Sequence, residues 1–223
     1  MNNLISKNEK IFIAGGHGMA GSAIKRSLLK FGYGDNNLGG EILTPTRKEL
    51  DCLDINSVQT WFDKNSPSIV IIAAAKVGGI LANSTKPADF LLDNIKIQTN
   101  LIDTAWKHGV KRLLFLGSSC IYPKLASQPI KEEYLLDGPL ETTNEWYAIA
   151  KICGIKLCES LSKQYNFDAI SLMPTNLYGP KDNYHEQNSH VMAALIRKFC
   201  DAKDKSYDSV TCWGTGNPLR EFL

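Results

Sequence analysis

The chain has 223 residues, of which 43% are hydrophobic and 22% are charged. This length fits one full domain plus a remainder, and the apolar content suffices for one large core, so disorder, collagen and coiled coil are excluded. Lys and Arg total 25 against 23 Asp and Glu, which gives a net charge of +2. So balanced a charge argues against a dedicated nucleic-acid binder, and we expect no nucleic-acid partner.

The N-terminal residues and the cysteines bear on the cellular compartment. Residues 1–10 are polar and show no apolar stretch followed by a cleavage site, and no run approaches the roughly 18 apolar residues of a membrane helix. The six cysteines are scattered without a C-x-x-C pair, so neither a zinc site nor a disulfide framework is predicted. We therefore expect a cytoplasmic protein with reduced thiols, no metal and no membrane contact.

Short apolar runs alternate with longer segments of helical periodicity, as in repeated strand-helix units. The expected strands cover residues 10–14, 41–43, 68–75, 112–116 and 169–173, and the expected helices cover 19–31, 55–64, 87–108 and 145–165. A strand that is apolar on both faces, such as 68–75, is typical of a parallel sheet buried between helices. The pattern predicts an α/β fold, a doubly wound parallel sheet of the Rossmann type.

The pattern changes after Pro174. A helix over 189–202 and a short strand near 210–213 are expected there, before the apolar residues at the end. This remainder is too short for an independent core. We therefore expect residues 1–175 to form a dinucleotide-binding Rossmann domain and residues 176–223 to form the N-terminal part of an incomplete, smaller substrate-binding domain.

A glycine-rich turn directly follows the first expected strand and opens the first helix. In such a turn, glycines permit the close approach of a pyrophosphate, whose charge the free N–H groups of the helix stabilise. The predicted cofactor contacts are Gly15, Gly16, His17, Gly18, Met19, Ala20 and Gly21. The alternative is a sharp strand-to-helix turn with no ligand.

The end of the second expected strand indicates which dinucleotide binds. An NAD site usually offers a carboxylate there to the ribose 2′-hydroxyl, but residues 43–48 hold hydroxyls and cations, with no carboxylate before Glu49. Arg47 can form a forked contact with a 2′-phosphate, so NADP(H) is favoured over NAD. Alternatively, Arg47 and Lys48 are a solvated surface pair.

Tyr147 and Lys151 lie one helical turn apart on the same face of the fourth expected helix. A tyrosine with its ordinary pKa near 10 is a poor acid-base catalyst at neutral pH, and an adjacent ammonium favours its ionised form. Ser118 follows a strand at the carboxyl edge of the sheet, where its hydroxyl can orient a carbonyl for Tyr147. Without Ser118, the alternative is an amphipathic helix with a surface lysine.

These residues resemble the extended short-chain dehydrogenase/reductases, which use a Ser-Tyr-Lys set with a nicotinamide cofactor. Longer strings are similar to the GDP-L-fucose synthase family within that group. The strings are AAAKVGGI (73–80), FLGSSCIYPK (115–124), YAIAKICGIKLCE (147–159), MPTNLYGP (173–180) and NSHV (188–191). The similarity runs over essentially the whole chain from Lys10.

The resemblance implies an NADPH-dependent enzyme that converts GDP-4-keto-6-deoxy-D-mannose to GDP-L-fucose by 3,5-epimerisation and 4-keto reduction. Ser118, Tyr147 and Lys151 match the reductase triad, and Cys120 and His190 match the pair used for epimerisation. The 4-keto group acidifies the hydrogens on C3 and C5, so a thiolate can remove one and an imidazole can return one. Without the resemblance, Cys120 reads as a buried structural thiol and His190 as a surface histidine.

The resemblance also implies further contacts. For the cofactor these are Arg47, Leu116, Gly117, Ser118, Ser119, Lys151, Pro174, Thr175, Asn176 and Leu177, and for the substrate His190, Lys198, Trp213 and Arg220. Two positions depart from the family, because His17 and Lys198 each stand where an arginine is usual. The family also continues well beyond the residues that match this chain, which implies that turnover is impaired.

Two other functions remain open. A different nucleotide-sugar epimerase or reductase would keep Ser118, Tyr147 and Lys151 without needing Cys120 and His190, and an inactive cofactor-binding fragment needs no catalysis. A homodimer is also expected through the helices 87–108 and 145–165. They carry more apolar positions than one sheet-facing stripe needs, including Trp106, Ile152 and Leu161.

Overall fold

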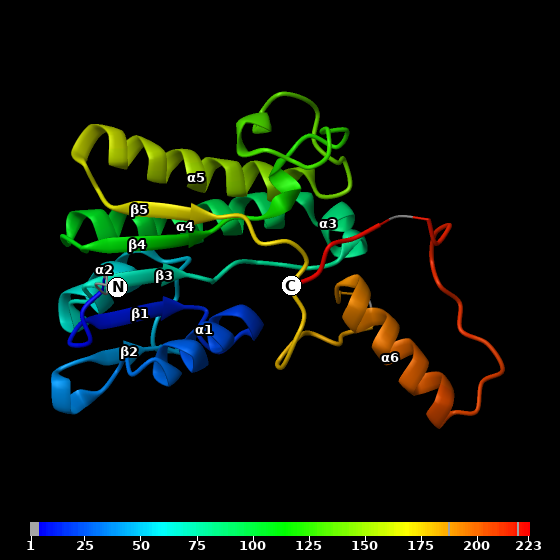
Figure 1. Cartoon of the computed structure of the whole chain (residues 1–223), viewed down its shortest axis with the longest axis horizontal. Coiled ribbons are helices and arrows are strands. Elements are labelled where there is room, and N and C mark those ends of the chain that lie inside the picture. Colours follow the sequence, from blue (N-terminus) through cyan, green and yellow to red (C-terminus); the bar gives the residue numbers. More distant parts are fainter. Residues whose placement is uncertain (1–4, 187, 218) are drawn as a thin grey trace.

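The computed structural model describes residues 5–186, 188–217 and 219–223, so residues 1–4, 187 and 218 of the two expected domains lie outside it. Five strands form one fully parallel sheet in the order β2-β1-β3-β4-β5 (Figure 1). They are β1 (Lys10–Ala14), β2 (Glu41–Leu43), β3 (Ile69–Ile72), β4 (Arg112–Leu116) and β5 (Ala169–Leu172). The predicted α/β class and parallel sheet are confirmed.

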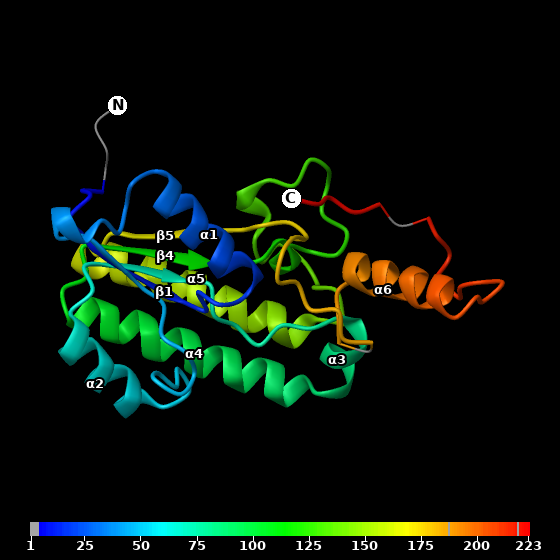
Figure 2. The same ribbon diagram turned by 90° about the horizontal axis from the view of Figure 1, so that it is seen from below.

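Helices cover both faces of the sheet. They are α1 (Met19–Lys30), α2 (Ile55–Asn65), α3 (Ile80–Thr85), α4 (Pro87–Lys107), α5 (Glu145–Tyr165) and α6 (Val191–Asp204). Figure 2 places α1 on one face, α2, α4 and α5 on the other, and α6 beyond the end of the sheet. No helix in the described part of the chain has the length and apolar content needed to cross a bilayer.

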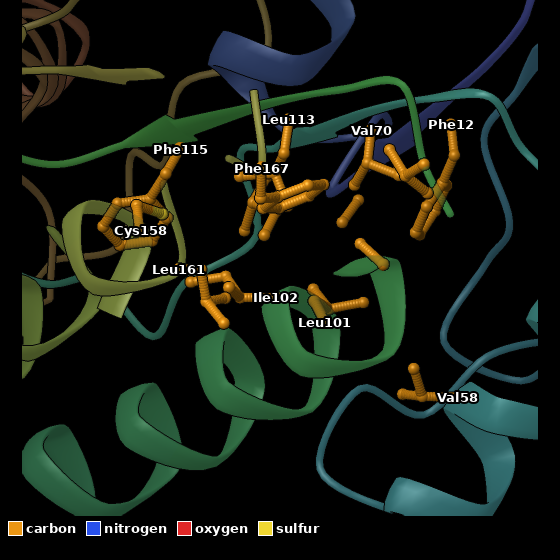
Figure 3. Close-up of a cluster of buried hydrophobic side chains, with 14 of the residues drawn as sticks. Phe12, Val58, Val70, Leu101, Ile102, Leu113, Phe115, Cys158, Leu161 and Phe167 are labelled. Carbon is orange, nitrogen blue, oxygen red and sulfur yellow. The ribbon is translucent and has the colours of Figure 1, made fainter. Parts of the chain in front are cut away.

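Strand side chains alternate between two apolar clusters, as the period of a strand requires. The larger cluster lies under α2, α4 and α5 and includes Phe12, Val70, Leu113 and Phe115, all fully buried (Figure 3). The smaller lies under α1 and is centred on Ile11, Ile13, Ile69 and Ile71. The carboxyl ends of the central strands are thereby held rigidly at one edge of the molecule.

The helix α5 packs closely on α4 and on β4 because residue 154 has no side chain. A Cβ at Gly154 would lie 2.6 Å from the ring of Phe115 and 2.9 Å from Oε1 of Gln98. Gln98, buried on α4, donates to the backbone carbonyl of Ala150 at 2.5 Å. The contact at Ala150 lies one helical turn from Tyr147. The packing of α5 on α4 and β4 therefore determines how deeply the Tyr147 side chain is buried.

Ile152 and Leu161, which the sequence pattern marks as surplus to the sheet-facing stripe, are not exposed for an interface. Both are buried in the larger cluster, and Trp106 is partly buried with its ring 4.5 Å from that of Tyr165. Ile152 and Leu161 point inward because α5 packs against both β4 and α4. A helix that is buried on two sides needs apolar residues over a broader face than a single stripe.

Apart from short 3₁₀ turns and shifts of one or two residues at element ends, three features differ from the sequence prediction. The strand β3 ends at Ile72, because residues 73–79 leave the sheet as a loop to the unexpected short helix α3. The strand predicted near 210–213 is absent. A strand needs a hydrogen-bonded neighbour, and in this part of the described chain the only such pairing is an isolated bridge between Asn176 and Phe222.

Candidate active site

The glycine turn after β1 is tight because neighbouring backbone leaves no room for side chains. Gly15 has φ +78°, and a Cβ there would lie 2.8 Å from the amide nitrogen of Ala74. A Cβ at Gly21 would collide with the carbonyl of Gly15. By contrast, Gly18 has room for a Cβ within the protein, so its glycine is not required by internal packing. The surface at Gly18 is therefore open to close approach by a ligand.

The N-terminus of α1 has the features of an anion-binding site. Its N-cap is Gly18, no side chain in the described residues caps it, and its first turn holds no acidic residue. The orphan N–H groups of a first turn, with the positive end of the helix dipole, stabilise phosphate. The predicted residues from Gly15 to Gly21 thus fit the pyrophosphate of a dinucleotide.

Three cationic or potentially cationic side chains lie around the end of β2. His17 contacts the carbonyl oxygen of Thr44 at 2.8 Å, and Lys25 donates to the Thr44 hydroxyl at 3.0 Å. Arg47 is exposed three residues further on. The sequence prediction missed Lys25, although a lysine one turn beyond the glycine motif was a usable signal.

The nearest carboxylate, Glu49, is already engaged. Its Oε2 accepts from the backbone N–H of Thr46 at 2.7 Å and from its hydroxyl at 2.8 Å, and these bonds lower the pKa of the carboxyl. The Glu49 carboxylate therefore stabilises the turn at residues 46–49 and is not available to accept from a ribose 2′-hydroxyl. This favours a dinucleotide with a 2′-phosphate over one with a free 2′-hydroxyl.

The two remaining predicted cofactor segments lie side by side. Gly117 donates to the carbonyl of Leu172 at 2.8 Å, and Ser119 donates to that of Pro174 at 3.1 Å. Pairing between β4 and β5 thus continues beyond both strands and brings residues 116–119 against 174–177. A cavity of about 360 Å³ opens beside them, with Ser119 and Thr175 in its lining.

Ser118, Cys120, Tyr147 and Lys151 form one cluster at the end of β4. The Oγ of Ser118 accepts from the backbone N–H of Cys120 at 3.4 Å, which caps the short 3₁₀ helix Ser119–Ile121. The ammonium of Lys151 donates to the carbonyl of Leu116 at 2.7 Å and lies 5.7 Å from the centre of the Tyr147 ring.

Burial dominates the protonation of this cluster. It lowers the pKa of Lys151 from 10.5 to about 8, and the nearby Cys120 opposes this. Burial raises the pKa of the Tyr147 hydroxyl, and Cys120 raises it further. The sequence predicted that Lys151 would favour ionised Tyr147, but burial and Cys120 raise the pKa of the hydroxyl instead, so Tyr147 keeps its proton.

The same desolvation acts on the predicted base. Burial raises the pKa of the Cys120 thiol, although a hydrogen bond from Ser118 and the charge of Lys151 lower it. Cys120 is therefore a protonated thiol at neutral pH.

The predicted substrate residues lie apart from this cluster. His190 is the exposed N-cap of α6, and no hydrogen bond or ion pair within the described residues joins it to Cys120. Lys198 and Trp213 do meet, with the ammonium 4.7 Å from the ring centre, but Trp213 is 74% exposed. Arg220 is exposed beside residues 221–223, which pair with the predicted cofactor segment at Asn176.

Comparisons with known proteins identify the family of this chain. The sequence pattern of the NAD dependent epimerase/dehydratase family matches residues 11–223. The chain belongs to this family. The resemblance inferred from the sequence is likewise confirmed by relatives at high identity.

Two curated relatives are similar over nearly the whole chain. "Probable GDP-L-fucose synthase 1" of Oryza sativa subsp. japonica is 56% identical over 221 residues, 99% of this chain and 66% of that protein. "GDP-L-fucose synthase" of Escherichia coli (strain K12) is 54% identical over 215 residues, 96% of this chain and 65% of that protein. The chain thus spans about two thirds of the length of these relatives.

A solved structure is similar in fold as well. A GDP-L-fucose synthetase from Naegleria fowleri bound to NADP has a TM-score of 0.85 and 30% identity, covering 98% of this chain and 70% of that one. The Rossmann-like fold of this family member is therefore firmly established.

The buried ammonium of Lys151 yields a test of stability against pH. The fall in its pKa from 10.5 to about 8 corresponds to roughly 3 kcal/mol of unfavourable burial. Lys151→Met removes the charge and keeps an apolar contact with the ring of Phe115, which now lies 4.7 Å from the ammonium. Allowing about 1 kcal/mol for the lost hydrogen bond to Leu116, we expect the variant to gain about 1 to 2 kcal/mol in unfolding free energy at pH 7.

The gain should depend on pH in a defined direction. Below pH 8, folded and unfolded chains both carry the charge and the full cost applies. Between pH 8 and 10.5 only the folded state loses the proton, so the parent becomes more stable and the advantage of the variant shrinks. Urea unfolding at pH 7 and pH 10 measures this, with the exposed Lys156→Met as control. An equal difference at both pH values would contradict it.

Proposed function

We propose that this chain carries the cofactor site and reductase cluster of an enzyme that converts GDP-4-keto-6-deoxy-D-mannose to GDP-L-fucose with NADPH. The observation that carries the proposal is the cluster of Ser118, Cys120, Tyr147 and Lys151 at the end of β4, in a chain 54% to 56% identical to proteins named GDP-L-fucose synthase. Because the chain spans about two thirds of these relatives, the activity of the whole protein is proposed rather than established.

In the reductive step, Tyr147 supplies the proton. Burial raises the pKa of its hydroxyl, which stays protonated at neutral pH but is a weaker acid. It can still donate as negative charge develops on the C4 oxygen, because an alkoxide is a stronger base than a phenolate. Ser118 orients that oxygen, and Lys151, held at the carbonyl of Leu116, supplies positive charge near the phenol. NADPH, when bound, supplies the hydride.

In the epimerisation step, we assign Cys120 and His190 to the hydrogens on C3 and C5. The thiol must first lose its proton, and both the Ser118 hydroxyl and the Lys151 ammonium favour the thiolate. His190, exposed at the start of α6, would return a proton from the opposite side of the sugar.

For the cofactor, we propose NADP(H) rather than NAD. Support comes from His17, Lys25 and Arg47 around the end of β2, from the engaged carboxylate of Glu49, and from the NADP held by the Naegleria fowleri protein. The pyrophosphate would lie on the first turn of α1.

Arg47 and Lys25 are the proposed contacts of the 2′-phosphate. Arg47→Ala and Lys25→Ala should each weaken NADPH binding about tenfold, the loss of one charge-assisted contact, and leave NADH binding unchanged. Calorimetric titration with both cofactors measures this, and Lys30→Ala at the far end of α1 is the matched control. If both variants bound NADPH as tightly as the parent, the assignment would be wrong.

The second prediction separates the two half-reactions. Cys120→Ser should abolish deuterium exchange at C3 and C5 while the NADPH site stays occupied. Tyr147→Phe should permit that exchange and block NADPH oxidation, because the 4-keto group acidifies its neighbours before hydride arrives. Loss of a positioned acid or base costs about 100-fold to 10,000-fold in rate.

Mass spectrometry of the recovered GDP-sugar counts the incorporated deuterium. Cys153→Ser, an exposed thiol on α5, is the control and should behave as the parent. Exchange at the parent rate in Cys120→Ser would return Cys120 to the role of a structural thiol.

We propose a homodimer that forms across the outer sides of α4 and α5. Supporting it are the exposed apolar side chains of Leu92, Trp146 and Tyr165 on a helix layer that no other element covers in Figure 2. Leu92→Glu should shift the protein toward monomer in analytical ultracentrifugation, whereas Leu125→Glu, on an exposed loop, should not. A monomeric parent at micromolar concentration would refute the dimer.

We further propose that residues 1–175 act as the dinucleotide-binding domain and that 176–223 belong to the substrate-binding domain. Few side chains of the second part are buried, among them Ala193 and Ala202 of α6. Cytoplasmic location is proposed because all six cysteines are free thiols.

A further inference from the structure

The position of His190 depends on a contact between two distant loops. Gly79, at the end of the loop after β3, donates its N–H to the carbonyl of Asn188 at 3.2 Å. A Cβ at Gly79 would lie 2.5 Å from the carbonyl oxygen of Ser189, so only glycine permits this approach. Both views place α3 beside the start of α6 (Figures 1 and 2). His190 follows at once as the N-cap of α6.

Asn83 holds the glycine side of this contact. It is buried on α3, and its Nδ2 donates to the carbonyl of Gly78 at 2.8 Å and to that of Gly79 at 3.1 Å. A helix of six residues contributes little rigidity by itself. The side chain of Asn83 therefore fixes the backbone of both glycines.

Two buried polar atoms at this contact have no partner. Within the described residues, these include Oδ1 of Asn83 and Oγ of Ser189. Each belongs to a residue that touches Gly79, one from α3 and one from the segment before α6. One atom is an acceptor and the other can donate, and since no hydrogen bond joins them directly, one buried water can satisfy both.

We propose that Asn83 is a positioning residue for His190, acting through Gly79 and through a buried water that links it to the Ser189 hydroxyl. The role of His190 in epimerisation rests on the proposed function, whereas the link between Asn83 and Ser189 does not. This link fixes the start of α6, and with it the imidazole.

The cofactor end of the same loop is anchored separately. Asn94, buried on α4, accepts from the N–H of Lys76 at 2.9 Å and donates to its carbonyl at 3.0 Å. The Lys76 ammonium also bridges Asp89 at 3.0 Å and Asp93 at 2.7 Å. A change at Asn83 should therefore not reach the glycine turn at Gly15, and NADPH affinity serves as an internal control.

Hydrogen exchange on the full chain tests the link without requiring turnover. Asn83→Leu and Ser189→Ala should each speed exchange of the amides at 188–194 by about tenfold, and NADPH affinity should change less than twofold. The exposed Ser84→Ala on α3 should change neither. The double variant should exchange no faster than Asn83→Leu alone, because both changes break the same link.

Parent-like exchange in the single variants, or fully additive effects in the double variant, would overturn the proposal. If Asn83→Leu fails to fold, as judged by circular dichroism and NADPH binding, Ser189→Ala alone decides. On activity, both variants should lower deuterium incorporation at C3 and C5 about tenfold. If the parent protein incorporates no deuterium at C3 and C5, the proposed function is refuted. The amide exchange rates at 188–194 would still test the link between Asn83 and Ser189.

Discussion

All five strands of the sheet point the same way, and the rest of the structure depends on this constraint. Because their carboxyl ends lie at one edge, the glycine turn after β1, the loop after β3 and the serine after β4 converge there without being close in sequence. The helix α5 then crosses the same edge, and the missing side chain at Gly154 sets how closely it approaches β4. The cluster of Tyr147 and Lys151 follows from these two facts.

The cluster illustrates how stability and chemistry conflict at a site. An ammonium at Lys151 is unfavourable where it is buried, and a carbonyl and an aromatic ring compensate only partly. The same desolvation keeps Tyr147 protonated and Cys120 neutral. A charged ligand entering this edge would meet groups whose protonation is balanced by burial, so small changes in local polarity have large effects on which of them carries the proton.

Much of the fold could be predicted from the sequence because the buried strands are short continuous apolar runs, α4 has clear apolar periodicity, and α5 is a long apolar segment. The failures have physical causes. The strand expected near 210–213 has suitable residues but no neighbour to pair with, and α3 is too short to show a period. For the site, the glycine turn, Ser118, Tyr147 and Lys151 carry recognisable spacing. Lys25 lies one turn beyond the glycine turn, but only its contact with Thr44 shows that it faces the end of β2. Asn83 carries no spacing signal, because its importance comes from the contact of Gly79 with Asn188 and Ser189.

The pairing of Asn176 with Phe222 has a consequence for how the molecule opens. The two segments on either side of α6 form one unit that is joined by a single isolated parallel bridge, and so short a pairing is marginal by itself. Most of its apolar side chains, including Phe199 and Trp213, remain exposed, whereas the central strands of the sheet are buried in the core. Because so few of its apolar side chains are buried, we expect this unit to open locally at a lower cost in free energy than the sheet, so that local opening rather than global unfolding governs access to the edge of the sheet.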